Sequence, residues 1–426
     1  MIRKVLIREM DLIKIREDGE KWSTKGLETG GYLFGRIHPN MVAEITKVID
    51  GGPKARRTGI SYSGDNEYAS MKIRELREID PEVRLIGEYH IHPWKGRARL
   101  SYGDLRQLSE VKELIPWFLC ILSTKDEMKA WDLDGKNERE VPLHVLSLPD
   151  GICREDLLDR ILRATRHEVL MKKTALLVGL GSGGSVVAKY LGCTGIGRII
   201  LVDKEELEVP NLIRHEGSLK DLGRKKVEIC KEMIEKKNPF TVVEAYDIDV
   251  TEDRERVEEL AMESDIILGA SGSPRVNSLL NRISLDMEKP AVYGGMFEMA
   301  RGGYVLSVKP RETACFNCLF EITSRAYSVD GEDAKRYGLS EEELHAQQGL
   351  WIDISIPALI FAKKAVWMLE GKEIDKNFTL YRSNLEVLRL RVDRRDDCFV
   401  CNREGWIRKF RRRSLKERIR DFLKRR

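Results

Sequence analysis

The sequence predicts an α/β protein of two domains, in which a mixed sheet precedes a doubly wound parallel sheet. Three observations support this prediction. The chain has 426 residues, more than one ordinary hydrophobic core accommodates. Residues 1–148 alternate short apolar runs with glycine-rich turns, whereas strands and helices alternate from residue 174 onward. That second order is typical of parallel sheets covered by helices on both faces.

Within residues 1–148 we expect a mostly β domain with two helices, at about 65–79 and 102–114. Residues 149–170 have helical spacing and are expected to link the two domains. The expected strands are the apolar runs GGYLFGRI, MVAEITKVI, RLIGEYHI, WFLCILST, AWDLD and VPLHVLSL.

The second domain is expected over residues 171–402. TALLVGLGSGG is a continuous apolar strand that runs into glycines and a helix. The strand RIILVD, a helix and the strands VVEAYDI and DIILGAS follow. This β-α-β-α-β order predicts the parallel sheet.

Composition restricts the function classes. Charged residues make up 34% of the chain and hydrophobic residues 42%, as in a globular protein with a charged surface. No apolar run reaches the length of a membrane span, and the N-terminus has no secretory signal, so we expect a cytoplasmic location. Residues 403–426 carry twelve Lys and Arg against three acids, a net +9, which leaves 4 − 9 = −5 for the rest. Binding of nucleic acid or of an anionic surface is therefore a question for this basic amphipathic tail.

The stretch IGEYHIHPWKGRARLSYGD, residues 86–104, contains a candidate metal site. His90 and His92 project to the same side of a strand, and paired imidazoles suit Zn²⁺. Asp104 is the nearby third ligand. Alternatively, Ser101 and Asp104 form a helix N-cap box, in which case the carboxylate only stabilises the helix end.

Upstream, GLETGGYLFG places Glu28 before a glycine pair and an apolar strand. ETGGYLFG, GEYHIHP and SYGD together resemble the JAB/MPN (JAMM) family of zinc metalloproteases over most of residues 1–148. The resemblance implies that His90, His92 and Asp104 hold a catalytic zinc. It also implies that Glu28 is the general base and that Ser101 polarises the scissile carbonyl.

The second candidate site is the segment GLGSGG. It supplies Gly179, Gly181 and Gly184 between a strand and a helix, where their backbone can bind phosphates. Asp203 lies 19 residues beyond Gly184, at a strand end suited to bind ribose hydroxyls. NAD binding is the default interpretation of such a pattern. PNLIRH and DLGRKK, which follow the acidic strand end, argue against NAD.

These segments together resemble the ThiF/MoeB/ubiquitin-activating adenylyltransferases, which have a Rossmann-like fold, over roughly residues 171–402. The resemblance implies that Asn211, Arg214 and Lys226 surround the phosphates of ATP, with Mg²⁺ assisting, and that Arg214 and Lys226 stabilise charge on the reacting phosphoryl group. One departure is visible. Ser271 stands where this family usually carries a magnesium-binding aspartate, so either another acid replaces it or metal handling is altered.

The cysteines suggest a second metal. Cys315–Cys318 and Cys398–Cys401 form two C-x₂-C pairs, the spacing of a structural Cys₄ zinc, and related adenylyltransferases often carry one. The alternative is four buried or unpaired thiols. The other cysteines lie in apolar or helical contexts, where we expect packing residues: Cys120, Cys153, Cys193 and Cys230.

The leading hypothesis is a bifunctional enzyme that acts on a ubiquitin-like or sulfur-carrier protein ending in Gly-Gly. One domain removes or trims the carrier as a zinc (iso)peptidase, and the other adenylates its C-terminus. We expect a homodimer through the adenylyltransferase domain. The alternatives are a biosynthetic pair that matures and activates a sulfur carrier, and an interaction scaffold with one site inactive.

Overall fold

The structure is a computed structural model, and it describes residues 1–94, 96–101, 104, 118–134, 137–146, 154–297, 300–319 and 349–402. The chain divides into two compact units, Met1–Leu157 and Leu158–Arg426. The helix expected at 102–114, apart from Asp104, and the basic tail at 403–426 lie outside the described residues. None of the helices in the described ranges is long and apolar enough to cross a membrane.

The first unit is built on a mixed eight-stranded sheet in the order β10-β1-β3-β2-β6-β7-β8-β9. Its β1–β10, β1–β3 and β6–β7 pairs are parallel and the others antiparallel. The strands are β1 (Lys4–Arg8), β2 (Thr29–Ile37), β3 (Val42–Asp50), β6 (Arg84–Ile91), β7 (Phe118–Ser123), β8 (Met128–Asp134), β9 (Asn137–Val141) and β10 (Leu143–Leu146). A short hairpin, β4 (Arg56–Arg57) and β5 (Tyr62–Ser63), forms a separate two-stranded sheet.

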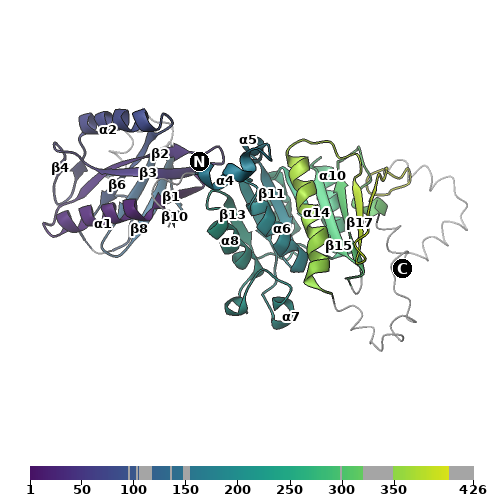
Figure 1. The fold of residues 1–426 in the computed structure, drawn as a ribbon. Coiled ribbons are helices and arrows are strands. Elements are labelled where there is room, and N and C mark those ends of the chain that lie inside the picture. The colour runs from purple at the N-terminus through teal and green to yellow at the C-terminus, as the bar shows by residue number, and fades with distance from the viewer. Residues whose placement is uncertain are drawn as a thin grey trace, which may run out of the picture. The chain divides into compact units, whose positions relative to one another are not determined.

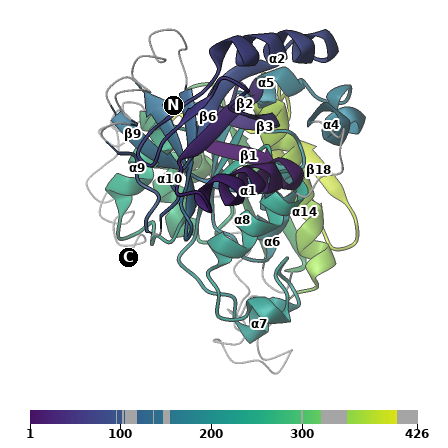
Figure 2. The ribbon, with the colours of Figure 1, turned by 90° about the vertical axis from the view of Figure 1, so that its left-hand side faces the viewer.

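Two helices cover opposite faces of this sheet, as both views show (Figures 1 and 2). The alternation of side chains along β2 explains why. Leu33 joins the core beneath α1 (Glu9–Ser23), and Tyr32 and Phe34 join the core beneath α2 (Asn66–Ile79). Asp65 caps α2 by accepting the backbone N–H of Tyr68.

The helix expected at about 65–79 is confirmed as α2, but α1 and β1 were not predicted. Within α1, charged residues surround the buried positions Leu12 and Ile15, and the buried set also includes Asp11 and Gly19. A helix whose inward face contains an acid and a glycine has a weak periodic signal, which is why the sequence pattern missed it.

The second unit contains another eight-stranded sheet, in the order β13-β12-β11-β14-β15-β16-β17-β18. From β13 to β15 every pair is parallel, which confirms the predicted parallel arrangement, and β16 to β18 extend the sheet with antiparallel pairs. The strands are β11 (Thr174–Val178), β12 (Arg198–Val202), β13 (Val242–Tyr246), β14 (Ile266–Gly269), β15 (Ala291–Met296), β16 (Gly302–Val308), β17 (Phe378–Arg382) and β18 (Val387–Leu390).

Helices lie on both faces of this sheet (Figure 1). The helices α6 (Ser182–Gly192), α8 (Lys226–Lys237) and α14 (Trp351–Leu369) share one hydrophobic core. The helices α9 (Arg254–Met262) and α10 (Pro274–Asp286) share the core on the other face. Shorter segments complete the unit: α5 (His167–Leu170), α7 (Val209–Leu212) and the 3₁₀ turn Leu219–Asp221, while α4 (Arg154–Leu162) contains the boundary between the units.

Candidate functional site

In the first unit, a glycine at the start of β2 sets the spacing between two strands. Gly30 pairs with His90 in the antiparallel β2–β6 ladder. A Cβ at position 30 would lie 2.4 Å from the backbone oxygen of Tyr89, so a residue with a side chain would push the strands apart. The close approach places Glu28, which immediately precedes β2, beside the histidines of β6.

Glu28, His90, His92 and Asp104 converge there, and all four are at most 6% exposed. The Nε2 of His90 lies 3.1 Å from Glu28 Oε2, and its Nδ1 lies 3.2 Å from Asp104 Oδ1. The Nε2 of His92 lies 3.6 Å from Asp104 Oδ2 and 3.9 Å from Glu28 Oε1. One ligand atom each from Glu28, His90 and His92 lies within 4.8 Å of the others. Two imidazoles between two carboxylates are donors that fit zinc.

Asp104 also takes part in the capping geometry that was the alternative interpretation. Its Oδ2 accepts the backbone N–H of Ser101 at 2.6 Å, and Ser101 Oγ accepts the backbone N–H of Asp104 at 3.1 Å. The capping contacts therefore coexist with the contacts to the histidines, and they fix the carboxylate in its orientation. The Ser101 side chain itself is exposed.

The pKa values within this cluster favour an ionised Asp104 beside a protonated His90. Burial raises the pKa of Asp104, but hydrogen bonds and the nearby imidazoles outweigh it and lower the pKa to about 2. Burial lowers the pKa of His90, but the hydrogen bond to Glu28 and the surrounding carboxylates raise it overall. Sequence reasoning missed Glu88, which lies two residues before His90 on the same strand face. Burial raises its pKa to about 7.

In the second unit, the glycine-rich loop forms a tight turn between β11 and α6. Gly179 has φ +91°, and a Cβ on it would lie 2.4 Å from the backbone of Ser271. A Cβ on Gly184 would lie 1.9 Å from the backbone oxygen of Gly179. A Cβ on Gly181, by contrast, would have no described atom within 4 Å beyond those of its own chain neighbours. The first and last glycines close the turn, and the middle one leaves open space for a ligand.

This open space belongs to a cavity of about 390 Å³, and the candidate nucleotide-binding residues Gly179, Gly181, Asp203, Asn211, Arg214 and Lys226 all line it. Gly184 is buried inside α6 and serves packing. Asp203 Oδ2 accepts the N–H of Leu180 at 2.5 Å, and its Oδ1 accepts the N–H of Glu205 at 2.8 Å. Burial raises the pKa of Asp203 despite these donors. Each carboxylate oxygen keeps a second lone pair for a ribose hydroxyl.

Lys226 and Arg214 are two of the four described cations that line the cavity, together with Lys204 and Arg275. The Lys226 side chain is 3% exposed, and its Nζ lies 2.5 Å from Glu205 Oε2. Arg214 and Asn211 come from the loop around α7, and both also line a neighbouring cavity of about 920 Å³. Asn211 and Arg214 therefore connect the two cavities, and the second is large enough for a peptide segment.

Ser271 also lines the cavity of about 390 Å³, directly after β14. Its hydroxyl oxygen accepts the N–H of Ser273 at 3.2 Å. Its backbone lies close to Gly179, so that a Cβ at position 179 would clash with it. The residue therefore contributes a neutral hydroxyl at this strand end.

Sequence reasoning missed His215, although it lies within the quoted NLIRH. Its Nε2 is 2.9 Å from the backbone oxygen of Leu180, and its Nδ1 accepts the N–H of Gly217 at 2.9 Å. Since Nδ1 accepts, Nε2 is the donor, so the imidazole is neutral. Burial lowers the pKa of His215, which agrees with that state. The histidine holds the middle of the glycine-rich loop in place.

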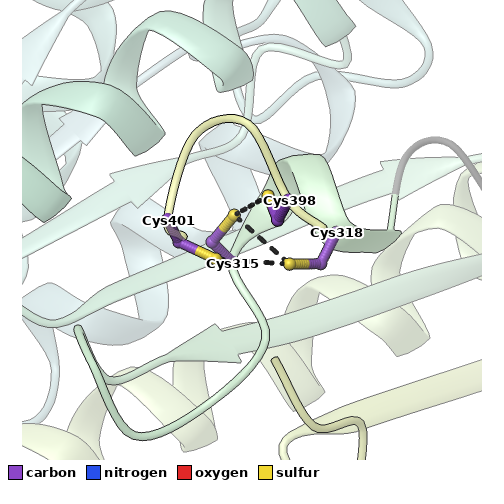
Figure 3. A group of neighbouring side chains, drawn as sticks. All are labelled: Cys315, Cys318, Cys398 and Cys401. Carbon is purple, nitrogen blue, oxygen red and sulfur yellow. Dashed lines mark hydrogen bonds between the residues drawn. The ribbon is translucent and has the colours of Figure 1, made fainter. Parts of the chain in front are cut away.

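The two C-x₂-C pairs come together (Figure 3). The sulfur–sulfur distances are 3.7 Å for Cys315–Cys318, 3.8 Å for Cys315–Cys398 and 3.4 Å for Cys318–Cys401. A tetrahedral zinc with bonds of about 2.3 Å separates its sulfurs by about 3.8 Å. The four thiols therefore could bind zinc.

The remaining cysteines are only partly as expected. Cys120 and Cys230 are fully buried, and burial raises the pKa of both thiols. The expectation that Cys193 is a packing residue was wrong, because it lies exposed at the C-terminal end of α6. Cys153 lies outside the described residues.

Comparisons with known proteins concern the second unit. The sequence model of the ThiF family matches residues 155–399. Protein HesA of Leptolyngbya boryana is 30% identical over 254 residues, which are 58% of this chain and 84% of that protein. Ubiquitin-like modifier-activating enzyme 5 of Dictyostelium discoideum is 26% identical over 194 residues, 43% of this chain and 51% of that enzyme. The chain thus spans about half the length of that enzyme. Among solved structures, E. coli MccB with ATP aligns with a TM-score of 0.44 and 19% identity, over 55% of this chain and 68% of that chain.

Proposed function

The chain belongs to the ThiF family and its C-terminal part is an ATP-dependent adenylyltransferase domain of that type, and we propose that this domain activates the C-terminal carboxylate of a carrier protein ending in Gly-Gly. The observation that carries the proposal is the cavity of about 390 Å³, in which an open glycine-rich turn, Asp203, Arg214 and Lys226 meet. Such a cavity suits a nucleotide whose phosphates react.

In the proposed reaction, a carboxylate oxygen of the carrier attacks the α-phosphorus of ATP. The bond from that phosphorus to the bridging oxygen breaks, and the electron pair leaves with pyrophosphate. Arg214, Lys226 and Asn211 stabilise the negative charge that spreads over the phosphoryl oxygens, and Asp203 holds the ribose. Mg²⁺ that arrives with ATP neutralises further phosphate charge.

The nature of the carrier is inferred from the relatives. One relative carries the name ubiquitin-like modifier-activating enzyme, so a ubiquitin-like or sulfur-carrier protein is the first substrate class to test. We propose that the adjoining cavity of about 920 Å³ receives its extended tail, because it shares Asn211 and Arg214 with the nucleotide cavity. We also propose a homodimer through this domain.

The test is exchange of labelled pyrophosphate into ATP with a set of ubiquitin-fold and sulfur-carrier proteins that end in Gly-Gly. The exchange should depend on the carrier and stop when its Gly-Gly is deleted. Arg214→Ala should abolish it, and Lys220→Ala, an exposed cation outside the cavity, should not. Binding of NAD without any binding of ATP would contradict the proposal.

A second candidate function belongs to residues 1–148, for which we propose a JAB/MPN-like zinc (iso)peptidase. The observation that favours it is the buried convergence of Glu28, His90, His92 and Asp104. His90, His92 and Asp104 would hold zinc. When bound, zinc polarises a carbonyl and lowers the pKa of water. Glu28 would accept a proton at its carboxylate and pass it to the leaving amine, and Ser101 would donate a hydrogen bond to the scissile carbonyl.

Cleavage of a ubiquitin-like fusion tests this candidate. Glu28→Gln should retain bound zinc and lose cleavage by at least about a hundredfold, because a general base contributes that much. Glu82→Gln, an exposed residue in the turn before β6, is the matched control and should cleave normally. Full cleavage by the Glu28 variant would exclude the assigned role.

We propose that Cys315, Cys318, Cys398 and Cys401 hold a structural zinc. Hydrogen bonds already orient the second pair: Arg394 donates to the backbone oxygen of Cys401 at 2.8 Å, and Cys398 O accepts the N–H of Asn402 at 3.0 Å. With four sulfur ligands the site has no open position, so its role would be folding rather than catalysis.

A further inference from the structure

Neighbouring strand ends line the nucleotide cavity in the order of the sheet. The lining residues are 248–251 after β13, 203–205 after β12, 179, 181 and 182 after β11, and 271, 273, 275 and 276 after β14. In the proposed adenylation, Asp203 binds the ribose at the end of β12, and the open turn at Gly181 holds the first phosphate at the end of β11. A nucleotide laid along this row therefore directs its outer phosphates toward β14 and the start of α10.

The described carboxylates that line the cavity all lie away from β14, at the ends of β12 and β13. Asp203 and Glu205 follow β12, and Asp249 follows β13. Each is engaged: Asp203 with backbone N–H groups, Glu205 with Lys226, and Asp249 with Lys204 and Thr251. Beyond β14, the described lining residues are neutral except for Arg275. The side that faces the outer phosphates therefore carries positive charge.

Arg275 is an exposed residue at the start of α10, and it lines the cavity without a hydrogen bond or ion pair to any described residue. Other cations of the cavity, such as Lys204 and Lys226, are paired with carboxylates. An arginine that faces a phosphate site without a carboxylate partner has all its guanidinium donors available for phosphate oxygens.

We propose that Arg275 binds the β- and γ-phosphates of ATP and stabilises the departing pyrophosphate. The proposal rests on the proposed adenylation. As the carrier carboxylate bonds to the α-phosphorus, the electron pair of the breaking bond passes to pyrophosphate, and Arg275 neutralises the charge that accumulates there. Ser273 supports its position, because its Oγ accepts the N–H of Val276 and fixes the start of the helix.

The experiment measures the affinity of the full chain for ATP, AMP and inorganic pyrophosphate by calorimetry, together with the exchange rate. Arg275→Ala should weaken ATP and pyrophosphate about tenfold while AMP affinity stays within about twofold, since AMP lacks the outer phosphates. Arg275→Lys should restore part of the loss. Arg282→Ala, an exposed arginine on the same helix outside the cavity, is the matched control.

Equal loss of ATP and AMP affinity in Arg275→Ala, or unchanged ATP affinity, would overturn the proposal. These outcomes are separable from failure of the proposed function. If the parent binds ATP but never exchanges pyrophosphate with any carrier, adenylation is refuted while the phosphate contact is still measured. If the parent binds neither ATP nor AMP, both proposals are wrong.

Discussion

The ammonium of Lys226 lies 2.5 Å from the Oε2 of Glu205 on the wall of the nucleotide cavity. The two side chains differ in environment, since that of Lys226 is 3% exposed and that of Glu205 is 60% exposed. The lysine is thus held in place by a carboxylate that faces solvent, and a bound polyphosphate would compete with that carboxylate for it.

Replacement of Glu205 should therefore strengthen nucleotide binding. Glu205→Gln removes a negative charge beside the phosphates, so we expect ATP affinity to rise several-fold, whereas Lys226→Met should lower it at least about tenfold. Titration calorimetry measures both. Glu206→Gln is the control, because Glu206 pairs with Lys225 and does not line the nucleotide cavity. Weaker ATP binding by the Glu205 variant would refute this competition.

His215 should make the glycine-rich loop sensitive to acid. Its pKa lies below the ordinary 6.5, so its contribution to stability is complete above about pH 6.5 and is lost as pH falls through the lowered pKa. His215→Gln should cost about 1–2 kcal/mol of unfolding free energy at pH 7.5. Denaturant unfolding of both proteins should show this gap shrinking toward pH 5. A gap that stays constant or grows would contradict the assigned neutral state.

The sequence predicted the parallel sheet because its strands are short continuous apolar runs flanked by glycines and helices. It also singled out residues far apart in the chain that the structure brings together, such as Glu28 with His90 and Cys315 with Cys398. In these cases the residue type and its local spacing restrict the chemistry strongly.

Other features depend on tertiary contacts that no local pattern encodes. The helix α1 buries an acid and a glycine on its inner face, so it lacks a clear apolar stripe. Cys193 occurs in an apolar helical segment but lies exposed at its end. The role of His215 arises from contact with Leu180, a residue 35 positions away.

Lys364 on α14 provides a test at alkaline pH. Its side chain is buried and donates to the backbone oxygens of Lys376 at 3.3 Å and Asn377 at 3.1 Å. Burial lowers its pKa from 10.5 to about 8. The cost of keeping a buried charge is therefore full below pH 8 and disappears as pH rises from 8 to 10.5.

Relative to Lys364→Met, the parent protein should thus gain up to about 3 kcal/mol of unfolding free energy as pH rises from 7.5 to 10. Denaturant unfolding at several pH values measures the difference between the two proteins, and groups common to both cancel. If the difference in unfolding free energy between the two proteins does not depend on pH, burial does not lower the pKa of Lys364.

Loss of the cysteine cluster should remove one metal and weaken the second unit. Cys318→Ser combined with Cys398→Ser should lower bound zinc by one equivalent and reduce thermal stability, because the metal contributes directly to folding. Cys193→Ser, at an exposed cysteine outside the cluster, should change neither zinc content nor stability. A double variant that keeps the zinc content and stability of the parent would disprove a structural zinc.

Mass spectrometry of a Gly-Gly-ended carrier after incubation with ATP and the full chain tests whether this domain adenylates the carrier. We expect the carrier to gain one adenylyl group at its C-terminal carboxylate with release of pyrophosphate. The product should be absent with Arg214→Ala or Lys226→Met and present with Lys220→Ala. Adenylation of the carrier by both cavity variants as fast as by the parent protein would contradict the proposed site, since the reaction would then take place without the proposed phosphate-binding residues of this cavity.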